Sequence, residues 1–232
     1  MAVTLFVTAT GLEAAPLKQA LPWQPLPFFY GALFRLEQSI YLAHLGVAKV
    51  NTAAGLALAI HTLKPDSVVQ FGIGGAFAES ELELGQVAVA TQETHLDTGV
   101  QLEHDWHDMK ALGFPLVNDL YNTFSTDNDL TRTLTKLTGA TPCTFGTSET
   151  VTGSQAGAEI LYNRFGVAVE SMEGAAAAQV CTALGVPFVE LRGISNIVGE
   201  RDKSQWDIGG AVGAVNRAAL TYLRALHNVT DG

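Results

Sequence analysis

The chain has little of several features that define common protein classes. It has two cysteines, Cys143 and Cys181, and neither stands in a CxxC pair or beside a histidine at metal-ligand spacing. This scarcity argues against a disulfide framework and favours a reduced, cytoplasmic protein. No apolar run approaches the roughly 18 residues of a membrane span, and the apolar N-terminus lacks the basic stretch of a signal peptide. We therefore expect no membrane association.

Positive charge is also scarce. Thirteen Lys and Arg face 23 Asp and Glu, for a formal net charge of −10, and no basic cluster occurs. A general nucleic-acid binder needs a basic surface, so we expect no nucleic-acid partner. Hydrophobic residues make up 47% and charged residues 16% of the 232, which is typical of a globular protein. Without a linker or repeat, residues 1–232 are predicted to form one domain.

Apolar strand patterns alternate with helical patterns along the whole chain, which indicates an α/β fold with a largely parallel central sheet. The Gly-rich run at 72–75 is predicted to form a turn after a strand, and residues 92–118 a loop. The predicted strands are 2–9, a pair within 28–44, 67–71, 86–91, 166–170 and 187–194. The predicted helices are 12–21, 48–63, 127–138, 154–164, 172–185 and 207–227.

Small ligands bind such sheets at the carboxyl ends of the strands, so polar residues that follow a strand are candidates for the site. Glu13 follows the first strand at a helix start, where an acid is favoured either by the helix dipole or by a catalytic role. Glu173 lies at a later helix start and can accept from ligand hydroxyls, or simply belong to a helix cap. Asn196 ends the last strand, where its amide can both donate and accept, or serve only in a turn.

Other reactive residues have weaker support. The histidines and aspartates of one loop do not have the spacing of a known metal motif, so we expect no metal site. They are His95, Asp97, His104, Asp105, His107 and Asp108. Ser148 and Cys143 have no histidine that the sequence would place beside them, which argues against a nucleophilic triad. The run Gly72–Gly75 is neither a dinucleotide nor a Walker motif, although it could let a ligand approach the backbone.

Taken in order, four motifs resemble the nucleoside phosphorylase/nucleosidase family over nearly the whole chain. They are the helix start Gly46–Asn51, the Gly-rich run 70–76, Ser171–Gly174 with its Met-Glu pair, and Arg192–Asn196. The resemblance implies a three-layer sandwich with a central mixed, largely parallel sheet flanked by helices. It also implies cleavage of a purine N-glycosidic bond without a metal or organic cofactor, and a homodimer.

The resemblance assigns roles to seven residues. Glu13 matches the carboxylate that activates water, and Asn196 stands where the family stabilises the departing purine. Met172 and Glu173 match the ribose contacts. Gly74 belongs to the Gly-rich run beside the ligand, and Val151 and Thr152 fall where the family lines the purine pocket. The chemistry is consistent, since bond cleavage leaves positive charge on the sugar and negative charge on the base.

Within the family, three features resemble a hydrolytic branch that removes hypoxanthine from a nucleoside intermediate of menaquinone biosynthesis. They are the Met-Glu-Gly-Ala form at 172–175, the run 195–199 with Arg201, Asp202 and Trp206, and the loop segments 97–100 and 111–115. Asn196 differs from the aspartate of adenine-releasing nucleosidases. These features predict hydrolysis of a nucleoside that carries a 6-oxopurine.

Three alternatives remain. A phosphorylase needs cationic donors for phosphate, but the corresponding positions are Gln70 and Ile73, so hydrolysis is favoured. An adenine-releasing nucleosidase of the methylthioadenosine type is the second alternative. A non-catalytic nucleoside-binding protein is the third, and Glu13 argues against it because binding alone needs no base.

Overall fold

The computed structural model describes residues 2–103 and 105–227, which form helices and strands in an α/β arrangement. In chain order these elements are β1 (Thr4–Thr8), α1 (Ala15–Ala20), β2 (Gln24–Leu26), β3 (Ala32–Glu37), β4 (Ile40–His44), α2 (Lys49–Leu63), β5 (Ser67–Ala76), β6 (Val87–His95), β7 (Gly99–Gln101), β8 (Trp106–Asp108), α3 (Met109–Leu112), β9 (Thr123–Ser125), α4 (Asp129–Thr138), β10 (Thr141–Thr147), α5 (Gln155–Phe165), β11 (Val169–Ser171), α6 (Gly174–Leu184), β12 (Phe188–Ile197) and α7 (Ile208–His227).

The main sheet is mixed and follows the order β11-β10-β6-β12-β5-β1-β4-β3-β2, with β9 added beside β6. Its centre is parallel, because β1 pairs with β4 and β5, and β5 pairs with β12. An antiparallel pairing also joins β11 to β5. The strands β5, β12, β6, β10 and β11 therefore close into a ring at one end of the sheet.

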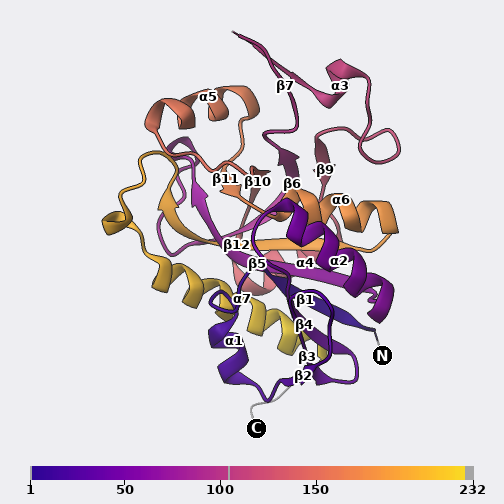
Figure 1. Ribbon diagram of the computed structural model, residues 1–232. Helices are drawn as coiled ribbons and strands as arrows, with labels where there is room; N and C mark the ends of the chain where they lie inside the picture. Colours follow the sequence, from indigo (N-terminus) through magenta and orange to yellow (C-terminus); the bar gives the residue numbers. More distant parts are fainter. Residues whose placement is uncertain (1, 104, 228–232) are drawn as a thin grey trace.

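Helices cover both faces of this sheet, with α1, α4 and α7 on one side and α2 and α6 on the other (Figure 1). The alternation of β1 shows why two apolar layers form. Phe6 packs into the cluster beneath α7, while Leu5 and Val7 pack into the cluster beneath α2 and α6. A central strand that is buried on both faces shows little alternation between apolar and polar residues. Residues 2–9, which are mostly apolar, fit this pattern. The predicted α/β fold with helix layers on a mixed sheet is confirmed.

Helix ends follow the local sequence signals. The side chain of Asn128 accepts from the N–H groups of Leu130 and Thr131 at the start of α4, and Ser154 caps α5 in the same way. Gly166 ends α5 in the left-handed conformation that glycine adopts without strain. Within the described residues, no helix is long and apolar enough to cross a membrane.

Two local predictions are wrong, and one strand of the sheet is missed. The run at 72–75 is not a turn, because β5 continues through it and its residues pair with 192–196 of β12. The loop predicted at 92–118 contains the end of β6, the β7–β8 hairpin and α3. The sequence does not predict strand β10, since Pro142 and a threonine at every third position leave it no apolar run.

Candidate active site

A cavity of about 720 Å³ opens where β1, β5, β11 and β12 end. The carboxyl ends of β1, β5 and β12 meet here because these three strands run parallel in the sheet, and β11 reaches the same place through its antiparallel pairing with the end of β5. The cavity is lined by every residue that the sequence predicted for the site: Glu13, Gly74, Val151, Thr152, Met172, Glu173 and Asn196. Residues more than 180 positions apart in the sequence, such as Glu13 and Asn196, therefore line one cavity.

Glu13 lies in the turn between β1 and α1, just before the first helical turn rather than in it. Its Oε2 accepts from the N–H and the hydroxyl of Thr10 at 2.9 and 3.0 Å, and its Oε1 accepts from the N–H of Ile73 at 3.1 Å. Burial raises the pKa of Glu13 above its ordinary value, the charge of Arg192 opposes this rise, and the charge of Glu173 adds to it. The result is a fixed carboxylate whose raised basicity suits proton abstraction.

Arg192 organises the floor of the cavity and is 2% exposed. It donates from Nε to Glu190 at 2.7 Å, from Nη1 to the carbonyl of Ile73 at 3.0 Å, and from Nη2 to Glu173 at 3.1 Å. Burial alone would lower the pKa of Arg192, but three surrounding carboxylates raise it, so the guanidinium stays charged. A buried cation of this kind fixes the geometry of the acids around it.

Glu173 directly precedes α6, whose N-terminal end favours a negative charge. Its Oε1 accepts from the N–H of Ala48 at 3.0 Å, and Oε2 accepts from Arg192. Ala48 has φ 77°, a conformation that is costly for a residue with a side chain. The strained start of α2 therefore aims a backbone donor at Glu173 and joins the motif Gly46–Asn51 to the site.

The Gly-rich run leaves room for the reacting side chains. A Cβ atom at Gly72 would collide with Oε1 of Glu13 and come within 2.8 Å of Nη1 of Arg192. A Cβ atom at Gly75 would lie 3.0 Å from Nδ2 of Asn196. A side chain at either strand position would displace the polar groups beside the cavity, so glycine suits both positions.

Asn196 is half-buried near the end of β12. Its Oδ1 accepts from the hydroxyl of Ser195 at 2.9 Å, and its Nδ2 donates to the carbonyl of Ile197 at 3.1 Å. A primary amide has two donor hydrogens and two acceptor lone pairs. One donor and one acceptor position are thus left for a ligand in the cavity.

Glu170 of β11 lines the same cavity and is 7% exposed. It accepts from the hydroxyl of Thr152 at 2.6 Å and from the N–H of Thr152 at 3.2 Å. Burial raises the pKa of Glu170 above its ordinary value, and the bonds from Thr152 and the charge of Arg201 oppose this rise only in part. Two donors aimed at this carboxyl suit an ionised acceptor, so Thr152 acts on the pocket through Glu170.

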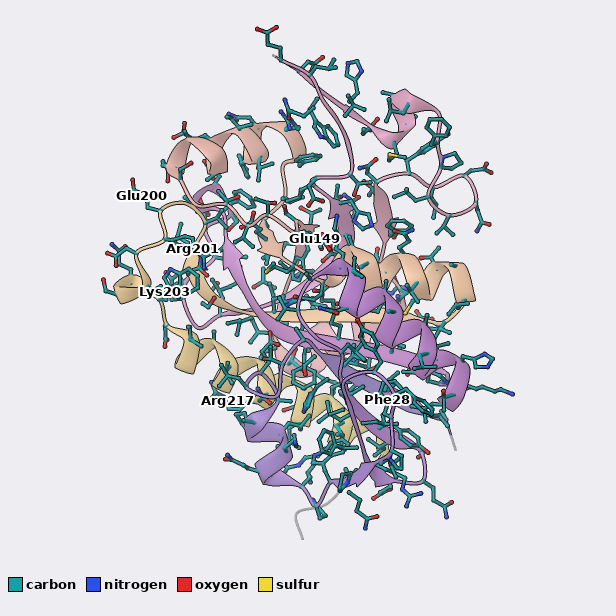
Figure 2. The ribbon with its side chains drawn as sticks, in the orientation of Figure 1. Phe28, Glu149, Glu200, Arg201, Lys203 and Arg217 are labelled. Carbon is teal, nitrogen blue, oxygen red and sulfur yellow. The ribbon has the colours of Figure 1, made fainter. Side chains whose placement is uncertain are left out.

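Two further side chains come from the loop between β12 and α7. Arg201 lies over the ring of Trp206, with 5.2 Å between the guanidinium carbon and the ring centroid, and both line the cavity. Figure 2 shows Arg201 on this loop, with Glu200 and Lys203 nearby. The rim of the cavity also includes Leu12 and Val47, which are 64% and 42% exposed.

The polar residues at the end of β6 and just after it have structural partners. Nζ of Lys49 donates to Asp97 at 2.5 Å, and the ring of His95 shares a hydrogen bond of 2.9 Å with Gln179. His104 lies outside the described residues. In the part of the chain that the structure describes, no three His, Cys, Asp or Glu side chains gather as they would around a metal ion.

Sequence reasoning missed several members of the site. The sequence motifs include Arg192 without assigning it a role of its own, and they assign no role to Glu170, Glu190 or Glu93. A signal was present for two of them. Glu190 and Arg192 alternate within an apolar strand, so both face the same side of a buried sheet, where a charge must find a partner.

Sequence comparison shows the family of the chain. The family model described as the phosphorylase superfamily matches residues 4–228. The chain belongs to this superfamily. The resemblance inferred from the motifs is thereby confirmed.

Curated relatives within the superfamily fall into two groups. The chain is 40% identical to a futalosine hydrolase of Streptomyces coelicolor over 80% of this chain and 79% of that protein. It is 32% identical to a futalosine hydrolase of Thermus thermophilus over 94% of each. A 5′-methylthioadenosine/S-adenosylhomocysteine nucleosidase of Marinomonas is 30% identical over 83% of this chain and 82% of that protein.

A solved structure confirms the fold independently. The structure of a futalosine hydrolase mutant of Helicobacter pylori has a TM-score of 0.85 and covers 97% of this chain and 100% of its own. The two sequences are 18% identical, so this likeness bears on the fold alone.

Proposed function

We propose that the chain hydrolyses the N-glycosidic bond of futalosine, releasing hypoxanthine and dehypoxanthinyl futalosine, as a step of menaquinone biosynthesis. The hydrolytic part rests on one observation: the fixed, basic carboxylate of Glu13 lies on the floor of a cavity large enough for a nucleoside. The choice of futalosine rests on the relatives that share this name, at 40% and 32% identity. Residues 1–232 act as a single nucleosidase domain.

In this mechanism the bond between the sugar and the purine breaks as a water oxygen attacks the sugar carbon. Glu13 accepts the proton of the water, and its three hydrogen bonds hold it in position for that step. Glu173 accepts from the ribose hydroxyls beside Met172. The negative charge of both carboxylates stabilises the positive charge that grows on the sugar.

The purine occupies the wall made by Asn196 and Glu170. Solvent supplies a proton to N7 as the bond breaks, and Glu13 returns the water proton to solvent afterwards, so the base leaves as neutral hypoxanthine. This base offers a donor at N7, an acceptor at O6 and a donor at N1. Oδ1 of Asn196 accepts from N7–H, and the remaining hydrogen on Nδ2 donates to O6. The Glu170 carboxylate accepts from N1–H. Adenine has an acceptor at N1, which would face the acceptor oxygens of Glu170. It has an amino donor at position 6, which would face the donor Nδ2 of Asn196. Gly74, Val151 and Thr152 complete this wall.

Phosphorolysis is the less suitable reaction. Gln70 is buried within β5, and Ile73 gives the cavity an apolar side chain where a phosphate would need donors. Arg192 is committed to Glu190 and Glu173. A phosphate beside Glu13 would also be repelled by the negative charges of Glu13 and Glu173. Water is neutral and meets none of these obstacles, and the reaction needs no cofactor.

We further propose that the chain works as a homodimer in the cytoplasm. Leu12 and Val47 leave apolar surface at the rim of the cavity, which a second copy would cover. Sedimentation equilibrium tests the dimer, and a monomer across the micromolar range would contradict it.

A base-release assay tests the function. The purified protein is incubated with futalosine, inosine and methylthioadenosine, with and without phosphate, and the products are separated by chromatography. We expect hypoxanthine from futalosine at a rate that phosphate does not change. A ribose 1-phosphate product would establish a phosphorylase, and faster adenine release from methylthioadenosine would establish the alternative nucleosidase. Release from no substrate would leave only a binding protein.

A further inference from the structure

Two buried glutamates form a pair beside Arg192, and one of them accepts from Nε, whereas Nη1 is the atom that faces Glu13. Glu93 of β6 and Glu190 of β12 are both fully buried. Oε1 of Glu190 accepts from Nε of Arg192 at 2.7 Å, and Oε2 of Glu93 accepts from the hydroxyl of Thr147 at 2.8 Å. The hydroxyl of Thr147 is fixed in turn by the N–H of Ala175 at 2.8 Å.

The other two oxygens of this pair lie together. Oε1 of Glu93 and Oε2 of Glu190 have no partner among the described residues. Both oxygens lie against the α-carbon of Gly174, where a Cβ atom would collide with each of them. Two ionised carboxylates cannot face each other in a dry site without a donor between them, because the repulsion and the lost hydration are both unfavourable. A single shared proton satisfies both oxygens.

The position of that proton follows from the neighbours. Glu190 accepts from the guanidinium of Arg192, whereas Glu93 accepts only from a hydroxyl, so the negative charge of the pair is better placed on Glu190, beside the cation. Burial, and then the negative charge of Glu190, raise the pKa of Glu93 well above its ordinary value. Glu93 thus carries the proton and donates it to Glu190.

We propose that Glu93 and Glu190 share one proton and act as positioning residues for Arg192, so that Arg192 orients Glu13 and Glu173 without cancelling their negative charge. The negative charge of Glu190, next to Nε, offsets part of the positive charge of the guanidinium. Without that charge, Arg192 would act more strongly on Glu13, whose Oε1 is 3.9 Å from Nη1, and would make it a weaker base. The inference rests on the proposed glycosidic reaction.

Few charged groups influence the pKa values of Glu13 and Glu93. Glu13 faces Arg192 from β12 and Glu173 from the start of α6. Glu93 faces Glu190 and Arg192, both from β12. Substitution at Glu190 therefore changes the electrostatic environment of Glu13 through a single intermediary.

The first test compares the dependence of kcat on pH in the parent and in Glu190→Gln. The glutamine oxygen still accepts from Arg192, but the charge is gone. We expect the acid limb of the profile to move to lower pH by about one unit, with a several-fold lower plateau. The exposed substitution Glu37→Gln serves as the control. A merely structural role would lower stability and leave the limb in place, and an unmoved limb overturns the proposal.

The second test uses conservative rescue at Glu93. Glu93→Leu leaves Oε2 of Glu190 without a donor, whereas the amide of Glu93→Gln donates as the protonated acid does. We expect Glu93→Gln to be several-fold more active than Glu93→Leu, with the acid limb at the parental position. Equal loss in both variants, or a limb shifted in Glu93→Gln as in Glu190→Gln, overturns the assignment of the proton.

A third measurement does not depend on catalysis. Infrared difference spectra of the parent and Glu93→Gln at neutral pH should show a protonated carboxyl stretch, sensitive to deuterium exchange, that the variant lacks. Absence of this band from the difference overturns the proton-sharing pair, whatever reaction the protein catalyses. A parent that releases no base, yet shows the band, refutes the proposed function and leaves the pair intact.

Discussion

Nη1 of Arg192 lies 3.9 Å from Oε1 of Glu13, within ion-pair range but beyond hydrogen-bond range. The backbone of Ile73 lies between them: its N–H donates to Glu13, and its carbonyl accepts from Arg192. Arg192 therefore orients Glu13 without occupying its oxygen, which keeps a lone pair for a water molecule.

Replacing Glu13 by Gln should lower kcat at least about a hundredfold, because a general base contributes on that scale. KM should change less, since the ribose and purine contacts remain. Steady-state kinetics with futalosine measure both, and the exposed substitution Glu37→Gln is the matched control. Near-normal turnover would remove Glu13 from the mechanism.

The rate should fall on the acid side because Glu13 must be ionised to accept a proton. Burial, opposed by Arg192 and reinforced by Glu173, raises the pKa of Glu13 above its ordinary value of 4.5. Activity is therefore present above that raised pKa and lost as the pH falls through it. The profile of kcat against pH measures the limb, and the residual rate of Glu13→Gln should lack it. If the limb persists in that variant, another group is titrating.

Glu173 should couple energetically to the ribose hydroxyls. Each charge-assisted hydrogen bond is worth about 1.5–3 kcal/mol, so Glu173→Ala should weaken both affinity and rate. A double cycle combines this variant with a substrate analogue that lacks the hydroxyls. The coupling energy in kcat/KM should be clearly different from zero. A value near zero would place the ribose elsewhere.

Asn196 should select the base. A mismatched buried contact costs about 1–3 kcal/mol, which predicts a tenfold to hundredfold preference for the 6-oxo over the 6-amino form of one nucleoside. In Asn196→Asp the donor to O6 is lost, so hypoxanthine release should weaken and the preference should shift toward adenine. The ratio of kcat/KM values measures this in parent and variant. Equal values on the parent, or an unchanged ratio in the variant, would show that base choice is set elsewhere.

Stability should also depend on Glu93. Its pKa is raised in the folded state, so its contribution to stability is full below the unfolded value of about 4.5 and is lost as the pH rises toward the folded pKa. Glutamine does not titrate. The free energy of unfolding of Glu93→Gln, relative to the parent, should therefore increase with pH above about 5. Urea unfolding at several pH values measures it, and a flat or falling difference would mean that folded Glu93 is ionised.

The sequence predicted the layers better than the interior of the site. Periodic patterns revealed β1 and the covering helices, because burial on one or two faces leaves a regular trace. Gly72 misled the prediction: glycine usually marks turns, but here a strand needs it to make room for Glu13 and Arg192. The pairing of Glu93 with Glu190 was also unpredictable, since it depends on an antiparallel contact between β6 and β12 that no local pattern encodes.

The ring formed by β11 and β5 has a consequence for self-association. Among the described strands of the main sheet, β2 and β9 pair on one side only. Each has three residues, and Pro25 removes a donor from β2. Exposed strand edges are templates for aggregation, and short or proline-containing edges are poor ones. The pairing of β11 with β5 brings Glu170 to the cavity, and it also leaves little free strand edge at which a second chain could add a strand.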